Sequence, residues 1–368
     1  MSVEVALRHG FPGFALDVDF RIEQPGITAL FGPSGAGKTS LVNAIAGLLH
    51  PRHGRIAVNG RVLFDSQAGI FVPPMARRVG YVFQEPRLFP HMNVEQNLRF
   101  GWRRSERRAS EGEIAHIVDL LGLAALLPRR PRHLSGGEKA RTALGRALLS
   151  SPEILLLDEP LASLDAARKV EIIPYLERLR DEARLPMLYV SHALDEVSRL
   201  ADSIVLLNAG QVVAQGSVFD VLTDLALPDF TGASPYGAVL DARVAAHCPD
   251  GLTVLSFPGG ELIVPRLQRA EGTRLRVRVR AEDVMLALEA PKAISANNIL
   301  PVTVEAVKPA GAVHADLRLR CGPTALIARI TRASLERLAL MPGTSAFAII
   351  KSVTVAPQLD PPATSFLP

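Results

Sequence analysis

The sequence predicts an α/β domain built on a mostly parallel sheet, followed by a small, mainly β domain. Three observations lead to this prediction. Short apolar runs alternate with helical stretches over residues 1–230, as in a parallel sheet covered by helices. Residues 235–368 instead contain segments such as Arg274–Arg280, in which apolar and charged side chains alternate. The chain has 368 residues, more than one ordinary domain holds.

Composition excludes several classes of protein. The sequence has no 18-residue uncharged apolar stretch, and residues 1–10 lack the apolar core of a signal peptide, so we expect a cytosolic protein that does not itself span a membrane. Cys248 and Cys321 form no close pair, which indicates neither a disulfide framework nor a zinc site. The net charge is +4, but the basic residues are dispersed, and the two densest clusters are interpreted as solvated faces. These clusters are Arg103, Arg104, Arg107 and Arg108, and Arg129, Arg130 and Arg132.

A glycine-rich loop follows the first apolar run. Residues 27–31 are predicted to form a buried strand and residues 40–49 a helix, and GPSGAGKT at 32–39 between them fits the phosphate-binding pattern G-x-x-x-x-G-K-[ST]. Chance gives such a match in roughly one random chain in a hundred, and the strand–loop–helix setting lowers those odds. We expect Lys38 to neutralise the outer phosphates and the Thr39 hydroxyl to ligate Mg²⁺. The predicted nucleotide-binding residues are Gly32, Pro33, Ser34, Gly35, Ala36, Gly37, Lys38, Thr39 and Ser40.

Two carboxylates end another apolar run. Residues 154–160 read ILLLDEP, which places Asp158 and Glu159 at the carboxyl end of a predicted central strand, where open α/β sheets bind ligands. We expect Asp158 to hold Mg²⁺, directly or through water, and Glu159 to polarise the attacking water. A strand followed by an acidic turn gives the same pattern, and the phosphate loop argues against this alternative.

The segment LSGGEKAR at residues 134–141 permits two interpretations. Ser135 and Glu138 have the spacing of a capping box that opens a helix over residues 136–149. The same geometry leaves the N–H groups of Gly136 and Gly137 uncovered beside the Ser135 hydroxyl, which makes an anion site. The segment alone does not decide between them.

Together these motifs resemble the nucleotide-binding domain of ABC transporters over residues 1–230. LSGGE matches the signature of that family and LDEP its acidic strand end. Gln84 in VFQE matches the glutamine of the lid loop, Asp165 in LASLD the loop that touches the partner subunit, and His192 in YVSH the switch histidine. The order and spacing of the motifs make this match specific.

The resemblance implies a P-loop ATPase that binds ATP and Mg²⁺ and works as a homodimer beneath a separate membrane permease. Each ATP would lie between the phosphate loop of one subunit and Ser135, Gly136, Gly137 and Glu138 of the other. The implied catalytic residues are Glu159, His192 and Gln84, and the implied metal ligands are Thr39, Gln84 and Asp158.

Other expectations from the resemblance concern adenine and the permease. Phe11 is the candidate for stacking on adenine, with Phe14 as the alternative. A helical subdomain at about 86–150 would face the permease, with Phe89, Pro90 and Met92 in RLFPHMNV lining the groove for a permease helix. Ordinary loop packing would explain the last three residues equally well.

The second domain, after a linker at 227–236, resembles the OB-like (Mop-like) oxyanion-binding module of molybdate transport and storage proteins. Residues 330–353 carry most of the match, and SANNIL at 295–300 resembles the segment S-A-R-N-x-L, with Asn297 where arginine is expected. The candidate oxyanion ligands are Ser295, Asn298, Thr331, Ser334 and Lys351. The alternative is a small β-barrel that only stabilises the dimer.

As a whole, the chain resembles the ATPase subunits of molybdate importers. This implies a peripheral protein on the cytoplasmic face of the inner membrane, with permease subunits as partners, an external oxyanion-binding protein acting indirectly, and no nucleic acid. One alternative is an importer ATPase for tungstate, sulfate, ferric iron or a polyamine. Another is a soluble ABC ATPase acting on nucleic acid or ribosomes, against which the sequence shows no long heptad insertion, second phosphate loop or concentrated basic stripe.

Overall fold

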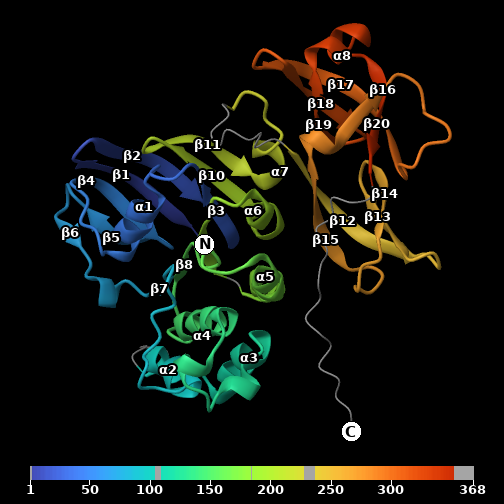
Figure 1. The fold of residues 1–368 in the computed structure, drawn as a ribbon. Coiled ribbons are helices and arrows are strands. Elements are labelled where there is room, and N and C mark those ends of the chain that lie inside the picture. The colour runs from blue at the N-terminus through green and yellow to red at the C-terminus, as the bar shows by residue number, and fades with distance from the viewer. Residues whose placement is uncertain (1, 104–108, 184, 228–236, 352–368) are drawn as a thin grey trace. The chain divides into compact units, whose positions relative to one another are not determined.

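The computed structural model describes residues 2–103, 109–183, 185–227 and 237–351, and the chain divides into two compact units, Met1–Gly216 and Ser217–Pro368. Figure 1 shows the elements of both units. Nearly all of the predicted linker lies outside the described residues, as do Arg104, Arg107 and Arg108 of the first basic cluster.

The first unit contains a sheet with the strand order β6-β5-β4-β1-β2-β11-β10-β3-β9-β8-β7 among the described residues. Its strands are β1 (Val3–Phe11), β2 (Phe14–Ile22), β3 (Gly26–Phe31), β4 (His53–Val58), β5 (Arg61–Asp65), β6 (Ile70–Phe71), β7 (Val79–Val82), β8 (Ile154–Asp158), β9 (Pro186–Val190), β10 (Ser203–Asn208) and β11 (Gln211–Ser217). Its helices are α1 (Lys38–Ala46), α2 (Val94–Trp102), α3 (Glu111–Leu120), α4 (Gly136–Leu148), α5 (Ala166–Glu182) and α6 (Leu194–Leu200), with short 3₁₀ turns at Pro74–Ala76, Ala124–Leu126 and Pro131–His133.

The predicted parallel sheet is confirmed at β10, β3, β9, β8 and β7, which pair in parallel. Every residue of β8 and β9 is buried, because helices cover both faces. Leu188 and Val190 pack in the cluster that contains α1, whereas the Tyr189 hydroxyl between them bonds Glu196 on α6. Since successive side chains on a strand point to opposite faces, α1 and α6 cover opposite sides of the sheet (Figure 1).

A second, antiparallel part of the same sheet begins with the N-terminal hairpin. β1 pairs with β2 on one side and with β4 on the other. Buried and exposed residues alternate along β2, as expected for a strand with one solvated face. The helices α2, α3 and α4 gather near the opposite edge of the sheet, where β7 lies (Figure 1).

The second unit is mainly β, as predicted. Its two sheets have the orders β14-β13-β12-β15 and β16-β20-β17-β18-β19. The strands are β12 (Gly237–His247), β13 (Leu252–Phe257), β14 (Gly260–Pro265), β15 (Arg274–Arg280), β16 (Val284–Ala287), β17 (Asn298–Ala310), β18 (His314–Cys321), β19 (Thr324–Thr331) and β20 (Ser345–Ile350), with helices α7 (Val218–Val221) and α8 (Arg332–Arg337) and a 3₁₀ turn at Ala281–Asp283.

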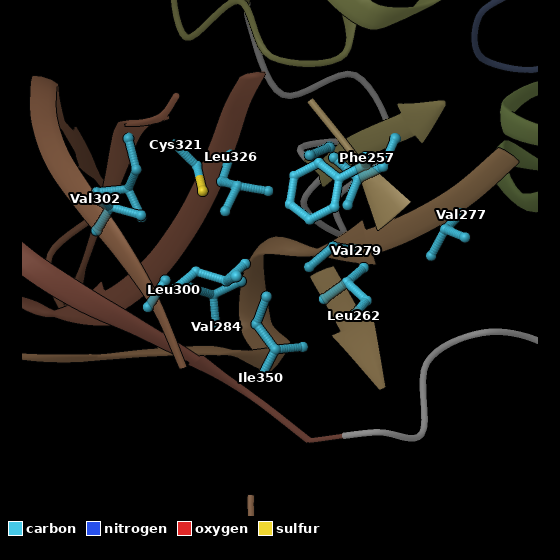
Figure 2. Close-up of a cluster of buried hydrophobic side chains, with 14 of the residues drawn as sticks. Phe257, Leu262, Val277, Val279, Val284, Leu300, Val302, Cys321, Leu326 and Ile350 are labelled. Carbon is cyan, nitrogen blue, oxygen red and sulfur yellow. The ribbon is translucent and has the colours of Figure 1, made fainter. Parts of the chain in front are cut away.

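One apolar core joins the two sheets of this unit (Figure 2). Phe257 and Leu262 come from the first sheet, and Leu300, Cys321 and Ile350 come from the second. The strand β20 lies between β16 and β17, so it pairs with two strands that precede it in the chain.

Candidate functional site

Four loops with predicted site residues follow neighbouring parallel strands. The loop 32–39 follows β3, and His192 lies beyond β9. Asp158 ends β8 and Glu159 follows it, and Gln84 lies beyond β7. Because parallel strands present their carboxyl ends at one edge of a sheet, these residues share that edge. The structure thus brings together residues that are up to 160 positions apart.

The phosphate loop wraps around its own lysine. Lys38 is buried, and its Nζ donates to the carbonyls of Gly32 and Pro33, each at 2.8 Å. Burial lowers the pKa of Lys38, and the nearby Glu159 and Asp158 carboxylates partly oppose this effect. Gly37 caps α1 with φ 97°, a left-handed conformation that favours glycine, and no described side chain caps that first turn. Its N–H groups therefore suit an anion.

Asp158 lies beside the hydroxyl that follows the lysine. The Thr39 hydroxyl donates to Asp158 Oδ1 at 3.1 Å. On its other side, the Tyr81 hydroxyl lies 3.1 Å from Asp158 Oδ2 and 3.0 Å from Asn43 Oδ1. Asp158 is only 7% exposed, and burial raises its pKa despite the two hydroxyl hydrogen bonds. Sequence reasoning did not single out Tyr81, whose signal is a polar group in the apolar strand β7.

Glu159 and His192 form a second pair at the same edge. His192 Nδ1 lies 3.3 Å from Glu159 Oε1. Glu159 has φ 47°, which is rare for a residue with a side chain, and its N–H donates to the carbonyl of Val190 at 3.1 Å. The His192 side chain is 59% exposed and that of Glu159 is 23% exposed. A carboxylate held there can orient and polarise water.

The LSGGE segment forms the predicted capping box at the start of α4. Glu138 N donates to the Ser135 hydroxyl at 3.2 Å, and Ser135 N donates to Glu138 Oε2 at 2.7 Å. The glycines also have a packing role that the sequence did not reveal. A Cβ atom on Gly136 would lie 2.7 Å from Leu164 Cδ2, and one on Gly137 would lie 3.1 Å from Ile172 Cδ1.

No hydrogen bond or ion pair within the described ranges joins the segment 135–138 to the loop 32–39 of the same chain. Asp165 accepts a hydrogen bond from Arg168 N at 2.9 Å and so caps α5. Gln84 is exposed just after β7.

The two candidate adenine contacts differ in position. Phe11 ends β1, and its ring centroid lies 5.9 Å from that of Phe14. Phe14 packs next to the phosphate loop, since a Cβ atom on Gly37 would lie 2.9 Å from Phe14 Cζ. Of the two rings, Phe14 thus packs directly beneath the loop.

The candidate oxyanion ligands form two separate groups within one chain. Asn298 begins β17 and pairs with Ile350, beside Lys351, with Ser295 just before it in the chain. Thr331 on β19 pairs with His314 on β18, and His314 pairs with Ala310, the last residue of β17. Thr331 therefore lies near the opposite end of β17 from Asn298. Thr331 caps α8 by accepting from Ser334 N at 3.1 Å. One subunit therefore does not assemble these residues around a single ligand.

Asn298 already has partners for its amide. It is buried, its Oδ1 accepts from Ile263 N, and its Nδ2 donates to the carbonyls of Ile263 and Ile350 at 3.1 and 3.2 Å. These bonds join β14, β17 and β20. The side chain thus braces the two sheets of the second unit.

Comparison with known proteins decides the family. A model of the ABC transporter family matches residues 15–162, and a TOBE domain model matches residues 294–357. The molybdenum import ATP-binding protein ModC of Mesorhizobium japonicum is 50% identical over 96% of each chain, and the protein of that name from Paramagnetospirillum magneticum is 47% identical over 96% of this chain and 98% of its own. The chain belongs to the ABC transporter ATPase family.

A solved structure of an ABC transporter component agrees with this assignment. The cbiO1 protein of Clostridium perfringens, described as part of the transporter complex cbiONQ, is 27% identical over 60% of this chain and 90% of its own, with a TM-score of 0.52. As an ABC transporter ATPase, the chain binds and hydrolyses ATP. No helix in the described part of this ATPase is long and apolar enough to cross a membrane.

Proposed function

We propose that this ATPase supplies the energy for molybdate import through a separate membrane permease, from the cytoplasmic face of the inner membrane. The observation that carries the ATPase part is the shared sheet edge, where Lys38 follows β3 and Asp158 and Glu159 lie at the end of β8, the two strands that flank β9. Relatives named molybdenum import ATP-binding proteins, about half identical along nearly the whole chain, support the substrate.

The residues at this edge fit Mg²⁺. The Thr39 hydroxyl and the Asp158 carboxylate are oxygen donors 3.1 Å apart, and hard cations prefer such ligands. Thr39 and Asp158 would hold the ion, with Gln84 at the next strand end. When bound, Mg²⁺ neutralises charge on the phosphates.

The protein's own groups perform the remaining steps. Lys38 exchanges the carbonyls of Gly32 and Pro33 for phosphate oxygens, and the uncapped N–H groups of α1 add donors. Glu159 orients and polarises the attacking water, and His192 holds Glu159 in place and faces the terminal phosphate. Phe11 or Phe14 stacks on adenine at the foot of the loop.

The second half of each nucleotide site comes from a partner subunit. The Ser135 hydroxyl and the first-turn N–H groups of Gly136 and Gly137 on the partner complete the phosphate shell, with Glu138 and Asp165 beside them. This head-to-tail homodimer explains why, among the described residues, the segment 135–138 makes no hydrogen bond or ion pair with the loop 32–39 of the same subunit. ATP binding would close the dimer, and hydrolysis would open it.

A cavity of about 860 Å³ offers a place for the permease. It lies between the helices α2 and α3 and the beginnings of β7 and β8, and its apolar lining includes Pro74, Met75, Phe100, Ile117, Leu148 and Leu179. Met75 is 94% exposed. The predicted groove residue Phe89 packs on Phe100 with ring centroids 4.2 Å apart, so it supports the wall. We propose that a permease helix enters this cavity.

For the second unit we infer a dimer-stabilising role. Two observations support this role. The side-chain amide of Asn298 already has hydrogen-bond partners within the unit, and Thr331 lies near the opposite end of β17 from Asn298. An oxyanion site built from two subunits stays the alternative.

Reconstitution tests the proposed function. The ATPase is co-expressed with candidate membrane permease subunits and placed in vesicles with an external oxyanion-binding protein. We expect radioactive molybdate uptake that needs ATP and that stops with Lys38→Ala. Uptake of sulfate, ferric iron or a polyamine in place of molybdate would identify another importer. Co-purification with ribosomes or DNA and not with a membrane protein would overturn transport altogether.

A further inference from the structure

Glu196 is a buried carboxylate that the proposed hydrolysis does not use. It lies in α6 and is 6% exposed. Its Oε1 accepts from Lys169 Nζ at 2.8 Å, and its Oε2 accepts from the hydroxyls of Tyr189 and Ser191, each at 2.8 Å. Burial and the adjacent Glu196 carboxylate raise the pKa of Tyr189, so the tyrosine keeps the proton that it donates.

These bonds hold the chain on both sides of His192. Ser191 precedes the histidine and donates to Glu196. The Ser191 hydroxyl also accepts from the N–H of Ala193, which follows the histidine, at 3.0 Å. The backbone of His192 is therefore held between two residues that depend on one buried carboxylate, while its imidazole projects toward Glu159.

Lys169 extends this network to another functional loop. It lies in the first turn of α5, and its N–H donates to the carbonyl of Asp165 at 3.0 Å. The Lys169–Glu196 ion pair is largely buried, with side chains 27% and 8% exposed. Because an unpaired buried charge is costly, a shift of the α5 start and a shift of the His192 loop are linked.

We propose that Glu196 is a positioning residue that sets His192 against Glu159, and that Lys169 makes this position depend on the segment at Asp165. The second half rests on the proposed function, because it assumes that Asp165 meets the partner subunit. Dimer closure would then act on the catalytic pair through α5, Lys169 and Glu196.

The test compares two carboxylates that join the same helices. Glu196→Gln keeps the size of the side chain but removes the charge that three donors share. Since a misplacement near 1 Å can cost about 100-fold in rate, we expect kcat to fall by about 10- to 100-fold. Binding of a fluorescent ATP analogue should change by less than about 2-fold, because Glu196 does not touch the phosphate loop.

Glu177→Gln is the matched control. Glu177 also joins α5 to α6, through Arg199 at 2.9 Å, and the two side chains are 15% and 12% exposed. Glu177 bonds Arg199 near the end of α6, whereas Glu196 bonds Ser191 beside His192, so kcat of this variant should stay near that of the wild type. Equal losses of kcat in the two variants would show a general packing effect and overturn the proposal.

Three further variants keep the proposal falsifiable if Glu196→Gln folds poorly. Ser191→Ala removes only a hydroxyl and should lower kcat while nucleotide affinity holds. Lys169→Met should lower kcat, and Lys169→Arg should restore it.

A double-mutant cycle supplies the decisive measurement. With His192→Ala in place, Glu196→Gln should reduce kcat little further, whereas independent, additive losses would overturn positioning through His192. If the wild-type protein bound ATP but did not hydrolyse it, the proposed function would be wrong. That result differs from additive losses of kcat, which would contradict only the positioning role of Glu196.

Discussion

The Nδ1 atom of His192 lies 3.3 Å from Oε1 of Glu159, on loops that leave the adjacent parallel strands β9 and β8. Glu159 also has a left-handed φ of 47°. A strained backbone at a polar pair is typical of a residue that is held for chemistry, since the surrounding structure must maintain it.

Glu159→Gln should lose hydrolysis but keep ATP binding. The amide can still form a hydrogen bond with His192, but it cannot act as a general base that accepts a proton from the attacking water. ATPase activity should therefore fall on the order of 100-fold or more. The phosphate loop is untouched, and Mg-ATP should therefore trap a closed dimer, which size-exclusion chromatography would detect. Near-normal turnover would remove Glu159 from its catalytic role.

Asp158→Asn should stabilise the nucleotide-free protein at neutral pH. Burial raises the pKa of Asp158, so the native state binds a proton more readily than the unfolded state does. The free energy of unfolding therefore begins to fall as pH rises past the ordinary aspartate pKa. The loss reaches its full size once pH exceeds the raised pKa of Asp158 in the folded protein. Removing the charge should raise Tm at pH 7.5, and the gain should shrink as pH falls toward the ordinary value.

Thermal melts across pH, with and without Mg-ATP, check this prediction. The variant should gain less stability from Mg-ATP than the wild type does, because a metal ligand is lost. A lower Tm than the wild type at neutral pH without nucleotide would contradict it.

Ser135→Arg and Lys38→Ala should each abolish ATPase activity, and their mixture should recover part of it. In a head-to-tail dimer the mixed pair retains one intact site, built from the wild-type Lys38 loop of one subunit and the wild-type Ser135 of the other. Turnover of the separately tagged, co-purified heterodimer measures this. A heterodimer that assembles but is no faster than either parent would rule out the shared site.

Ser110→Arg is the control for the lost cap. Ser110 and Glu113 form the same capping box at the start of α3, with Glu113 N donating to the Ser110 hydroxyl at 3.2 Å. Losing either cap should cost about 1 kcal/mol of stability. Only the change at Ser135 should remove ATPase activity.

Molybdate should bind the full chain no better than sulfate does. Calorimetry at millimolar oxyanion concentrations measures this binding. If Asn298 instead has a structural role, Asn298→Ala should lower Tm, because three backbone groups lose a hydrogen-bond partner. Heat from molybdate and tungstate but not from sulfate, abolished by Thr331→Ala, would instead establish an oxyanion site across the dimer.

The strands were largely predictable because burial on both faces leaves a continuous apolar run. The runs at 154–157 and 187–190 lie within β8 and β9, and the alternating segment coincides with β15 (Arg274–Arg280). The phosphate loop and the LDEP segment were recognisable because every contributing residue is close in sequence.

Tertiary contacts made the rest unpredictable. The need for glycine at position 136 arises from Leu164, and the role of Glu196 arises from Lys169 on another helix. Neither partner has a fixed spacing in the sequence. Asn298 was expected to face a ligand, whereas Ile263 on a strand of the other sheet and Ile350 on β20 provide its partners, and no local pattern shows this.

The place of β20 has a consequence for how the protein is made. The strands of the first unit are complete by residue 217, so its sheet can assemble while the ribosome still synthesises the remainder. The second sheet of the other unit cannot be completed so early in synthesis, because residues 345–350 form β20, which pairs with β16 and β17 and lies between them. Until then two strand edges stay open to pairing with other nascent chains, which makes this stage the most prone to aggregation.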